Sequence, residues 1–416
     1  MPLTIHLDNH RPEYHGNEDI IGLVSLTTTT PFPLKQVLIT FSGHAKTKIQ
    51  KVKGVGAPAS TYRSNVTLFE KQKVLLQLGG DVLAPGSYEW PFQFTFPTHE
   101  QGATTWAKLE PYRVDDNHPL PPTFAIETGD AARKLHCGIE YKLEAQVQKP
   151  QGGLFASKVP LYTEVVKLDF LNALTISNTI DLDPYATVYR QNKEQLCKVR
   201  SKLLLPNNRG RSLSMSEKLS SWFSSSQLPR FTYKVSFSYP TSLVQFAPYP
   251  CHLTVEAFME DSNVTEMPEV VMRSVAVSMT SRTSARAVPT LVGAMSAEID
   301  DKIEILNQTA LSIPVSGKMD LGQVFGPLVM RKTDVSFSTF NICRSYRLNV
   351  AAVFECAGKQ NEFKMEDVPI EVVARGVAGE SDQKDAVFME NGVEDELPPV
   401  YTPSESTSPV EVPEKA

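Results

Sequence analysis

The chain has 416 residues, of which 41% are hydrophobic and 30 are proline, so it can build two folded cores but is unsuited to long helices. Its formal net charge is -6, and residues 376–416 hold ten acidic and two basic side chains, which leaves +2 for the rest. A nearly balanced body lacks the basic footprint of a nucleic-acid-binding protein, so no nucleic acid is expected as a partner.

The first predicted strand carries three potential metal ligands, His6, Asp8 and His10, at alternate positions. On a strand they would share one face, but no fourth ligand is in view, so we expect neither a metal nor another cofactor. Residues 1–25 lack a basic stretch followed by an apolar run, and no apolar segment approaches the roughly 20 residues that span a bilayer. A cytoplasmic location is therefore expected.

A basic run follows the second predicted strand region, at Lys46, Lys48, Lys51 and Lys53. Such a run is typical of a solvated hairpin. The alternative is a patch that contacts acidic lipid or a protein cargo.

Strict alternation of apolar and polar residues recurs along the body. It predicts strands with one buried face, because successive side chains of a strand point to opposite faces. This pattern favours antiparallel sandwiches, an all-β fold. Pro91 lacks an amide donor and should lie at a bulge or on a sheet edge. The clearest alternating apolar positions are Tyr88, Trp90, Phe92, Phe94 and Phe96, followed by those within 139–147, 231–239, 275–279 and 346–354.

Residues 206–229 are rich in serine and basic side chains and read as a loop or linker within the second half. Ser214 and Glu217 have the spacing of a capping box, and Leu219, Trp222 and Phe223 share one helical face, which predicts a short helix. This helix could dock on the second sandwich or insert its aromatic residues into a membrane surface.

The same segment contains two candidate phosphosites, Ser212 and Ser214, which follow Arg209 and Arg211 in a pattern suited to basophilic kinases. A phosphate adds close to two negative charges and could be bound by a 14-3-3-type protein. A flexible solvated linker is the equal alternative.

From Gly376 onward the periodicity stops and acids, serine and proline dominate, so residues 376–416 are predicted to be a disordered acidic tail. This tail contains a PPxY motif, and Thr402 and Ser408, each followed by proline, are further candidate phosphosites. The motif residues are Leu397, Pro398, Pro399 and Tyr401.

No sequence pattern of a catalytic site is present. The chain has no Walker loop, H-E-x-x-H, G-x-S-x-G or Rossmann glycine pattern, so an enzyme is not indicated. Its five cysteines are scattered without a C-x-x-C pair, which predicts neither a disulfide framework nor a zinc knuckle and favours a reducing compartment.

Several segments, in the right order, resemble the arrestin family. The most specific is LAPGSYEWPFQFTFP at 83–97, and the resemblance covers roughly residues 1–375. It implies two arrestin-like sandwiches in tandem, over 1–172 and 173–375. The other segments are 14–26, 34–47, 119–124 and 138–147, similar to an arrestin N-terminal domain, and 335–359 and 368–373, similar to the end of a C-terminal domain.

The resemblance also implies a function. Arrestin-like proteins bind cytoplasmic segments of membrane transporters or receptors, and α-arrestins use a PPxY motif to bring WW-domain HECT-type ubiquitin ligases to that cargo. The implied protein is a non-enzymatic adaptor in ubiquitination, endocytosis and sorting, recruited from the cytoplasm to the plasma membrane and endosomes by peripheral association. The paired first-strand lysines of receptor-desensitising arrestins are missing from LTIHLDNHRPEY (3–14), so that phosphate trigger is not carried over.

Two other interpretations remain open. One is an arrestin-like scaffold in retromer-type trafficking or in pH or nutrient signalling, without ligase recruitment; the PPxY motif separates it from the adaptor. The other is a sandwich-fold carbohydrate-binding or hydrolytic protein, which would require a cleft with paired carboxylates or a secretory leader.

Overall fold

The computed structural model describes residues 3–51, 60–101, 109–113, 115, 118–129, 133–150, 160–171, 190–208, 211, 228–290, 293–330 and 334–374. Residues 1–376 group into one compact unit, which is built almost entirely of strands. The predicted all-β sandwich fold is therefore confirmed. The linker serines and the tail motif lie outside the described residues.

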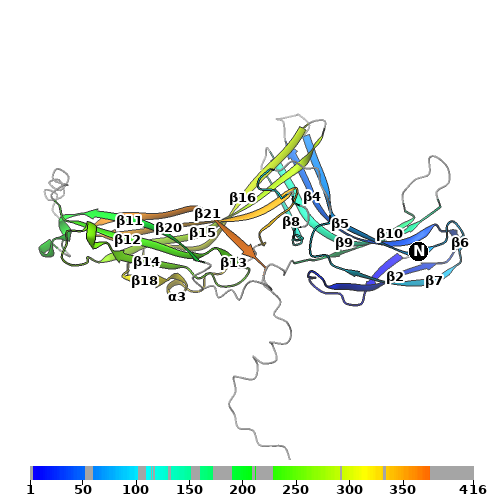
Figure 1. Ribbon diagram of the computed structural model, residues 1–416, viewed down its shortest axis with the longest axis horizontal. Helices are drawn as coiled ribbons and strands as arrows, with labels where there is room; N and C mark the ends of the chain where they lie inside the picture. The colour runs from blue at the N-terminus through cyan, green and yellow to red at the C-terminus, as the bar shows by residue number, and fades with distance from the viewer. Residues whose placement is uncertain are drawn as a thin grey trace, which may run out of the picture. The chain divides into compact units, whose positions relative to one another are not determined.

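The first sandwich packs a three-stranded sheet against a larger one (Figure 1). The small sheet has the order β1 (Leu3–Leu7), β2 (Asp19–Thr28), β7 (Gly86–Thr95). The larger has the order β10 (Tyr162–Leu168), β9 (Arg133–Gln148), β4 (Gln36–Lys51), β5 (Ser60–Gln77), with β8 (Phe124–Gly129) also paired to β9. Two short strands, β3 (Phe32–Pro33) and β6 (Val82–Leu83), pair with each other.

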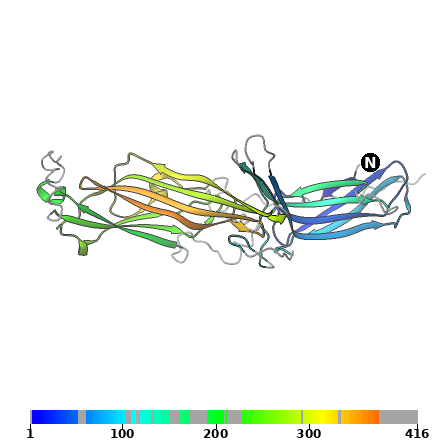
Figure 2. The ribbon, with the colours of Figure 1, turned by 90° about the horizontal axis from the view of Figure 1, so that it is seen from above.

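The second sandwich repeats this two-sheet plan. One sheet has the order β11 (Arg190–Arg200), β12 (Arg230–Pro240), β14 (His252–Ala257), β18 (Gly317–Asp320). The other has the order β13 (Ser242–Val244), β21 (Lys359–Val373), β20 (Ile342–Cys356), β15 (Val270–Thr290), β16 (Gly293–Gln308), with β17 (Ile313–Pro314) on β15 and β19 (Phe337–Ser338) on β20. Figure 2 shows the long yellow to orange strands of this sheet side by side.

Helical segments among the described residues are short, as expected for a chain rich in proline. They are the 3-10 turns η2 (Lys202–Leu204), η3 (Pro206–Asn208) and η5 (Met259–Asp261), and the helix α3 (Leu321–Phe325). Asp320 caps α3 by accepting a hydrogen bond from the amide of Gly322 at 2.8 Å. None of the helices described is long and apolar enough to cross a membrane.

The alternating aromatic strand is β7, and its pattern places its rings as predicted. Phe92, Phe94 and Phe96 are buried in the first core, while Tyr88 and Trp90 are half-buried and stacked on each other with ring centroids 5.9 Å apart. Because β7 is an edge strand, Pro91 needs no amide partner on its open side.

The two sandwiches have separate hydrophobic cores, but the first core also takes in residues from the second half of the chain. Ala285, Ala287, Phe340 and Ile342 are buried in it. The ends of β15 and β16 lie beside β4 (Figure 1). One strand pair also departs from the antiparallel pattern, because β13 runs parallel to β21.

Candidate functional site

The structure describes only part of the residues that the sequence singled out. The motif residues Leu397, Pro398, Pro399 and Tyr401, the candidate phosphosites Ser212, Ser214, Thr402 and Ser408, and Lys53 all lie outside the described residues. Of the predicted binding residues, Lys46, Lys48 and Lys51 lie within the described part of the chain.

These three lysines belong to β4, but they do not share one face. Lys46 and Lys48 alternate with the buried residues Ala45 and Thr47 and lie on the outer face of the larger sheet. Lys51 is an odd number of residues away from both, so it points to the opposite side at the end of the strand. The basic run of the sequence is thus divided by the pleat of the strand.

Strand register brings other basic residues to Lys48 that are distant in sequence. Arg63 on β5 and His136 on β9 lie directly opposite Lys48, one on each side. Lys48 and Arg63 are like charges in a cross-strand pair, an arrangement that destabilises a sheet unless an anion lies nearby. Neither side chain forms an ion pair with any residue that the structure describes.

A hollow of about 620 Å³ opens on this face and is called here the basic trough, lined by Lys46, Lys48, Arg63, His136 and Gly138 among others. Gly138 lies opposite both Lys46 and Ala125, and a Cβ at this position would lie 2.9 Å from the carbonyl oxygen of Phe124. The absence of a side chain therefore keeps the middle of the trough open.

Two carboxylates compensate part of the positive charge of the trough. Lys46 Nζ lies 2.5 Å from Glu140 Oε2, and this hydrogen bond holds the pKa of the Glu140 carboxyl below its usual value. His136 Nδ1 lies 3.3 Å from Glu127 Oε2. Lys48 and Arg63 remain uncompensated, so the trough is suited to bind an anionic group beside them.

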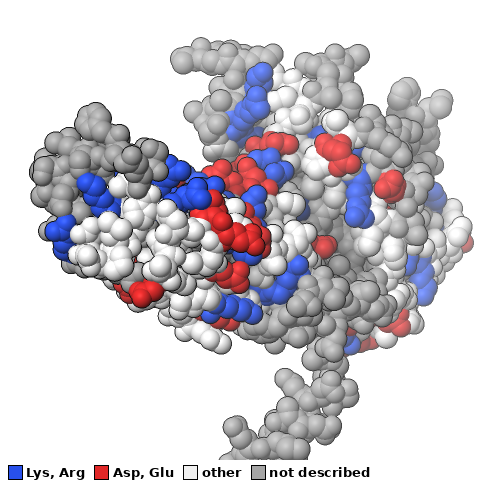
Figure 3. All heavy atoms as spheres, turned by 60° about the vertical axis from the view of Figure 1, so that its left-hand side comes forward, with Lys and Arg blue, Asp and Glu red and all other residues white. Residues whose placement is uncertain are grey.

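Several cations elsewhere on the surface pair with anions. On the second sandwich, Lys234 Nζ lies 3.4 Å from Glu194 and 3.2 Å from Glu256, each on a neighbouring strand. Asp261 accepts from both Lys198 and Arg230 at 2.8 Å. The face shown in Figure 3 displays this interspersed pattern.

A second polar feature lies where the two sandwiches meet, and sequence reasoning missed it. His118 Nε2 lies 2.7 Å from Glu100 Oε1, and the two side chains are only 3% and 0% exposed. The imidazole ring contacts Phe340 edge-on with centroids 5.1 Å apart. A buried ion pair of the first sandwich is therefore covered by an aromatic ring of the second.

Burial and charge act together on this pair. Burial raises the pKa of the Glu100 carboxyl, opposed by His118. Burial lowers the pKa of His118, but the hydrogen bond and charge of Glu100 and the carbonyl of Asp115 outweigh it, so this pKa is raised above its ordinary value. Both groups therefore hold protons more tightly in the folded protein.

Direct bonds join the two sandwiches around this pair. Thr47 Oγ1 donates to the Arg286 carbonyl at 3.0 Å, and Asn341 Nδ2 donates to the Ala45 carbonyl at 3.1 Å. The Arg286 guanidinium lies 4.5 Å from the centroid of the Tyr112 ring, a favourable cation-π distance. These bonds and the ring contact tie the two sandwiches together at defined positions.

Within the described residues no group of three or more His, Cys, Asp or Glu side chains could hold a metal ion. The candidate triplet at the N-terminus is separated because β1 ends at Leu7, so Asp8 and His10 follow the strand in a turn. His6 Nε2 lies 3.0 Å from the hydroxyl of Thr4. His6, Asp8 and His10 therefore do not share one strand.

The first sandwich matches a known family of domains. Residues 3–183 match the family model of the arrestin (or S-antigen) N-terminal domain. This range contains every strand of the first sandwich, from β1 to β10. This match supports an arrestin-type fold for the first sandwich. No curated protein matches the chain.

Proposed function

We propose that the protein is a non-enzymatic adaptor that brings a WW-domain HECT-type ubiquitin ligase to cytoplasmic segments of membrane transporters or receptors. The observation that carries the proposal is a PPxY motif, Pro398-Pro399-Val400-Tyr401, placed after an arrestin-fold body. The body provides surfaces that bind cargo, and the motif binds the WW domain of the ligase. The adaptor acts at the plasma membrane and endosomes, where ubiquitination directs the cargo into endocytosis and sorting.

Proximity labelling in cells tests this function against a scaffold without a ligase. The wild-type chain should label both a HECT-type ligase and membrane proteins, whereas Tyr401→Ala should lose the ligase and keep the membrane proteins. A chain that labels the same membrane proteins but no ligase, with or without Tyr401, would instead be a trafficking or signalling scaffold.

The basic trough is proposed to contact acidic groups of the cargo, because Lys48 and Arg63 face each other there without an acidic partner. Replacing both by glutamate should weaken binding to acidic cytoplasmic peptides of the cargo at least about tenfold, since two attractive charges become repulsive. Binding is measured by fluorescence anisotropy.

A matched control for the trough is Lys193→Glu with Arg200→Glu, two exposed positions on β11 of the second sandwich, which should leave the affinity unchanged. Equal loss in the control would mean that only net charge matters. If the double glutamate variant of the trough loses binding to phosphatidylserine vesicles but keeps binding to the peptides, the trough contacts the membrane surface instead.

Phosphorylation of Ser212 and Ser214 is proposed to recruit a 14-3-3-type protein and block the adaptor, because both serines follow arginines in RGRSLS. Ser212→Ala with Ser214→Ala should abolish 14-3-3 recovery and speed cargo turnover. The same double substitution at Thr402 and Ser408 serves as a comparison. Unchanged recovery and turnover under every nutrient condition would end the switch hypothesis.

A further inference from the structure

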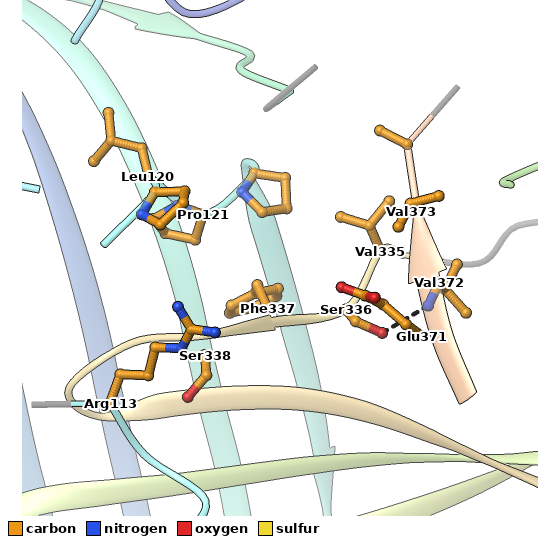
Figure 4. Close-up of a pocket in the computed structure, with 13 residues that line it drawn as sticks. Arg113, Leu120, Pro121, Val335, Ser336, Phe337, Ser338, Glu371, Val372 and Val373 are labelled. Atoms are coloured by element: carbon orange, nitrogen blue, oxygen red, sulfur yellow. Dashed lines mark hydrogen bonds between the residues drawn. The ribbon is translucent and has the colours of Figure 1, made fainter. Parts of the chain in front are cut away.

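A small pocket opens at the seam between the two sandwiches, and we name it the seam pocket. It is lined by Arg113 and residues 119–122 of the first sandwich and by residues 335–338 and 371–374 of the second (Figure 4). We propose that the seam pocket is a docking site for an extended peptide that inserts one apolar side chain, flanked by an acidic residue on one side and a basic residue on the other.

The walls of the pocket are already in place without a ligand. The Ser336 amide donates to the Val372 carbonyl at 2.7 Å, and the Val372 amide donates to Ser336 Oγ at 2.9 Å (Figure 4). Across the seam, Ser338 Oγ donates to the Pro111 carbonyl at 2.8 Å. The prolines at 119, 121 and 122 restrict the opposite wall. A preformed pocket spares a ligand the cost of ordering it.

Most of the buried side chains that line the seam pocket are apolar, and the space takes one side chain. Leu120, Val335, Val372 and Val373 are each less than 9% exposed, and the cavity measures about 140 Å³. Apolar cavities of this size hold a group about as large as benzene. A leucine, isoleucine or phenylalanine side chain therefore matches the space, and a whole folded domain does not.

The charges at the rim define the flanking residues. Arg113 and Glu371 are both exposed and flank Phe337 in the view of Figure 4. Neither forms a salt bridge within the ranges that the structure describes. An anionic residue of the peptide beside Arg113 and a cationic residue beside Glu371 complement this rim.

A docked peptide would contact both sandwiches at once, so it would strengthen the contact between them. This inference is independent of ligase recruitment, because the seam pocket and the PPxY motif share no residue. A small apolar molecule could fill the same cavity, but it would leave both rim charges without a partner. The rim therefore favours a peptide.

The test uses the full chain and three fluorescent peptides: Glu-Glu-Leu-Lys-Lys, Glu-Glu-Leu-Glu-Glu, and Glu-Glu-Ala-Lys-Lys. The wild-type protein should bind the first peptide best. Replacing leucine by alanine should cost about tenfold or more in affinity, because the apolar anchor is lost. Replacing both lysines by glutamate should cost about twofold to tenfold, because the exposed pair with Glu371 becomes a repulsion.

The decisive variant is Glu371→Lys, which makes both rim charges positive by a change at an exposed position. It should prefer Glu-Glu-Leu-Glu-Glu, and an unchanged melting temperature would show that the fold is intact. Equal affinity of the wild-type protein for both leucine peptides, an unchanged preference in the variant, or no binding at millimolar peptide would overturn the proposal. Equal affinity for free leucine amide would assign the pocket to a small apolar ligand instead.

Discussion

Replacing Tyr401 with alanine should abolish capture of a WW domain by this protein. Consecutive prolines at 398 and 399 hold the backbone near polyproline II, so little entropy is lost when their rings stack in an aromatic groove. Tyr401 enters the neighbouring pocket and offers its hydroxyl as a hydrogen-bond donor. Removing the phenol ring takes away both contacts.

Isothermal titration of the full chain with an isolated WW domain measures this effect. A single short motif should bind at about 10 μM, or about -7 kcal/mol, and Tyr401→Ala should reduce binding below detection. Because one copy binds weakly, efficient ubiquitination in cells should depend on multivalency or on co-localisation at a membrane.

The matched control is Val400→Ala, which changes the variable position of the same motif and should preserve most of the affinity. In cells, Tyr401→Ala should also lose the protein's own ubiquitination while its melting temperature stays the same. Undiminished WW binding by Tyr401→Ala at equal expression would show that ligase recruitment takes place elsewhere.

Removing one partner of the buried Glu100–His118 pair should be among the most destabilising changes in the protein. Glu100→Gln should lower the free energy of unfolding by about 3 kcal/mol, because it leaves the fully buried imidazole without its counter-charge. The covering ring of Phe340 belongs to the second sandwich, so the contact between the sandwiches should weaken as well. Urea denaturation measures the change.

The stability that the pair provides should depend on pH in a defined direction. The pKa values of Glu100 and His118 are both raised above their ordinary values of 4.5 and 6.5. As the pH rises past these ordinary values, the unfolded state loses its protons first, so the folded state binds more protons than the unfolded state. Stability from the pair is therefore fullest at acidic pH and is lost as pH rises through the folded pKa values.

Comparing the wild-type protein with a double variant that combines Glu100→Gln and His118→Gln isolates this effect. The difference in unfolding free energy between wild type and double variant should shrink from about pH 5.5 to about pH 8.5. The exposed pair of Glu127 and His136 is the control, and its double glutamine variant should change stability by less than about 1 kcal/mol at either pH. An identical pH slope in wild type and buried-pair variant would contradict the assignment.

Local patterns in the sequence were sufficient for the strands and the fold class. The period-two alternation over Phe92 and Phe94 depends only on neighbouring residues, and a strand necessarily turns such residues to one face. Pro91 predicted an edge or a bulge for the same local reason, since it lacks an amide donor. The aromatic block and the PPxY motif were likewise visible in the sequence, because each is a contiguous run of residues.

Register and long-range packing decided the rest. Lys48 and Lys51 appeared to form one basic run, but the strand pleat separates them, while pairing with β5 brings Arg63 to Lys48. Glu100 and His118 are 18 positions apart in stretches without periodicity, so no local signal could pair them. The seam pocket joins residues more than 200 positions apart. Such sites depend on which strand ends the two sandwiches bring together, and only the packed tertiary structure determines that.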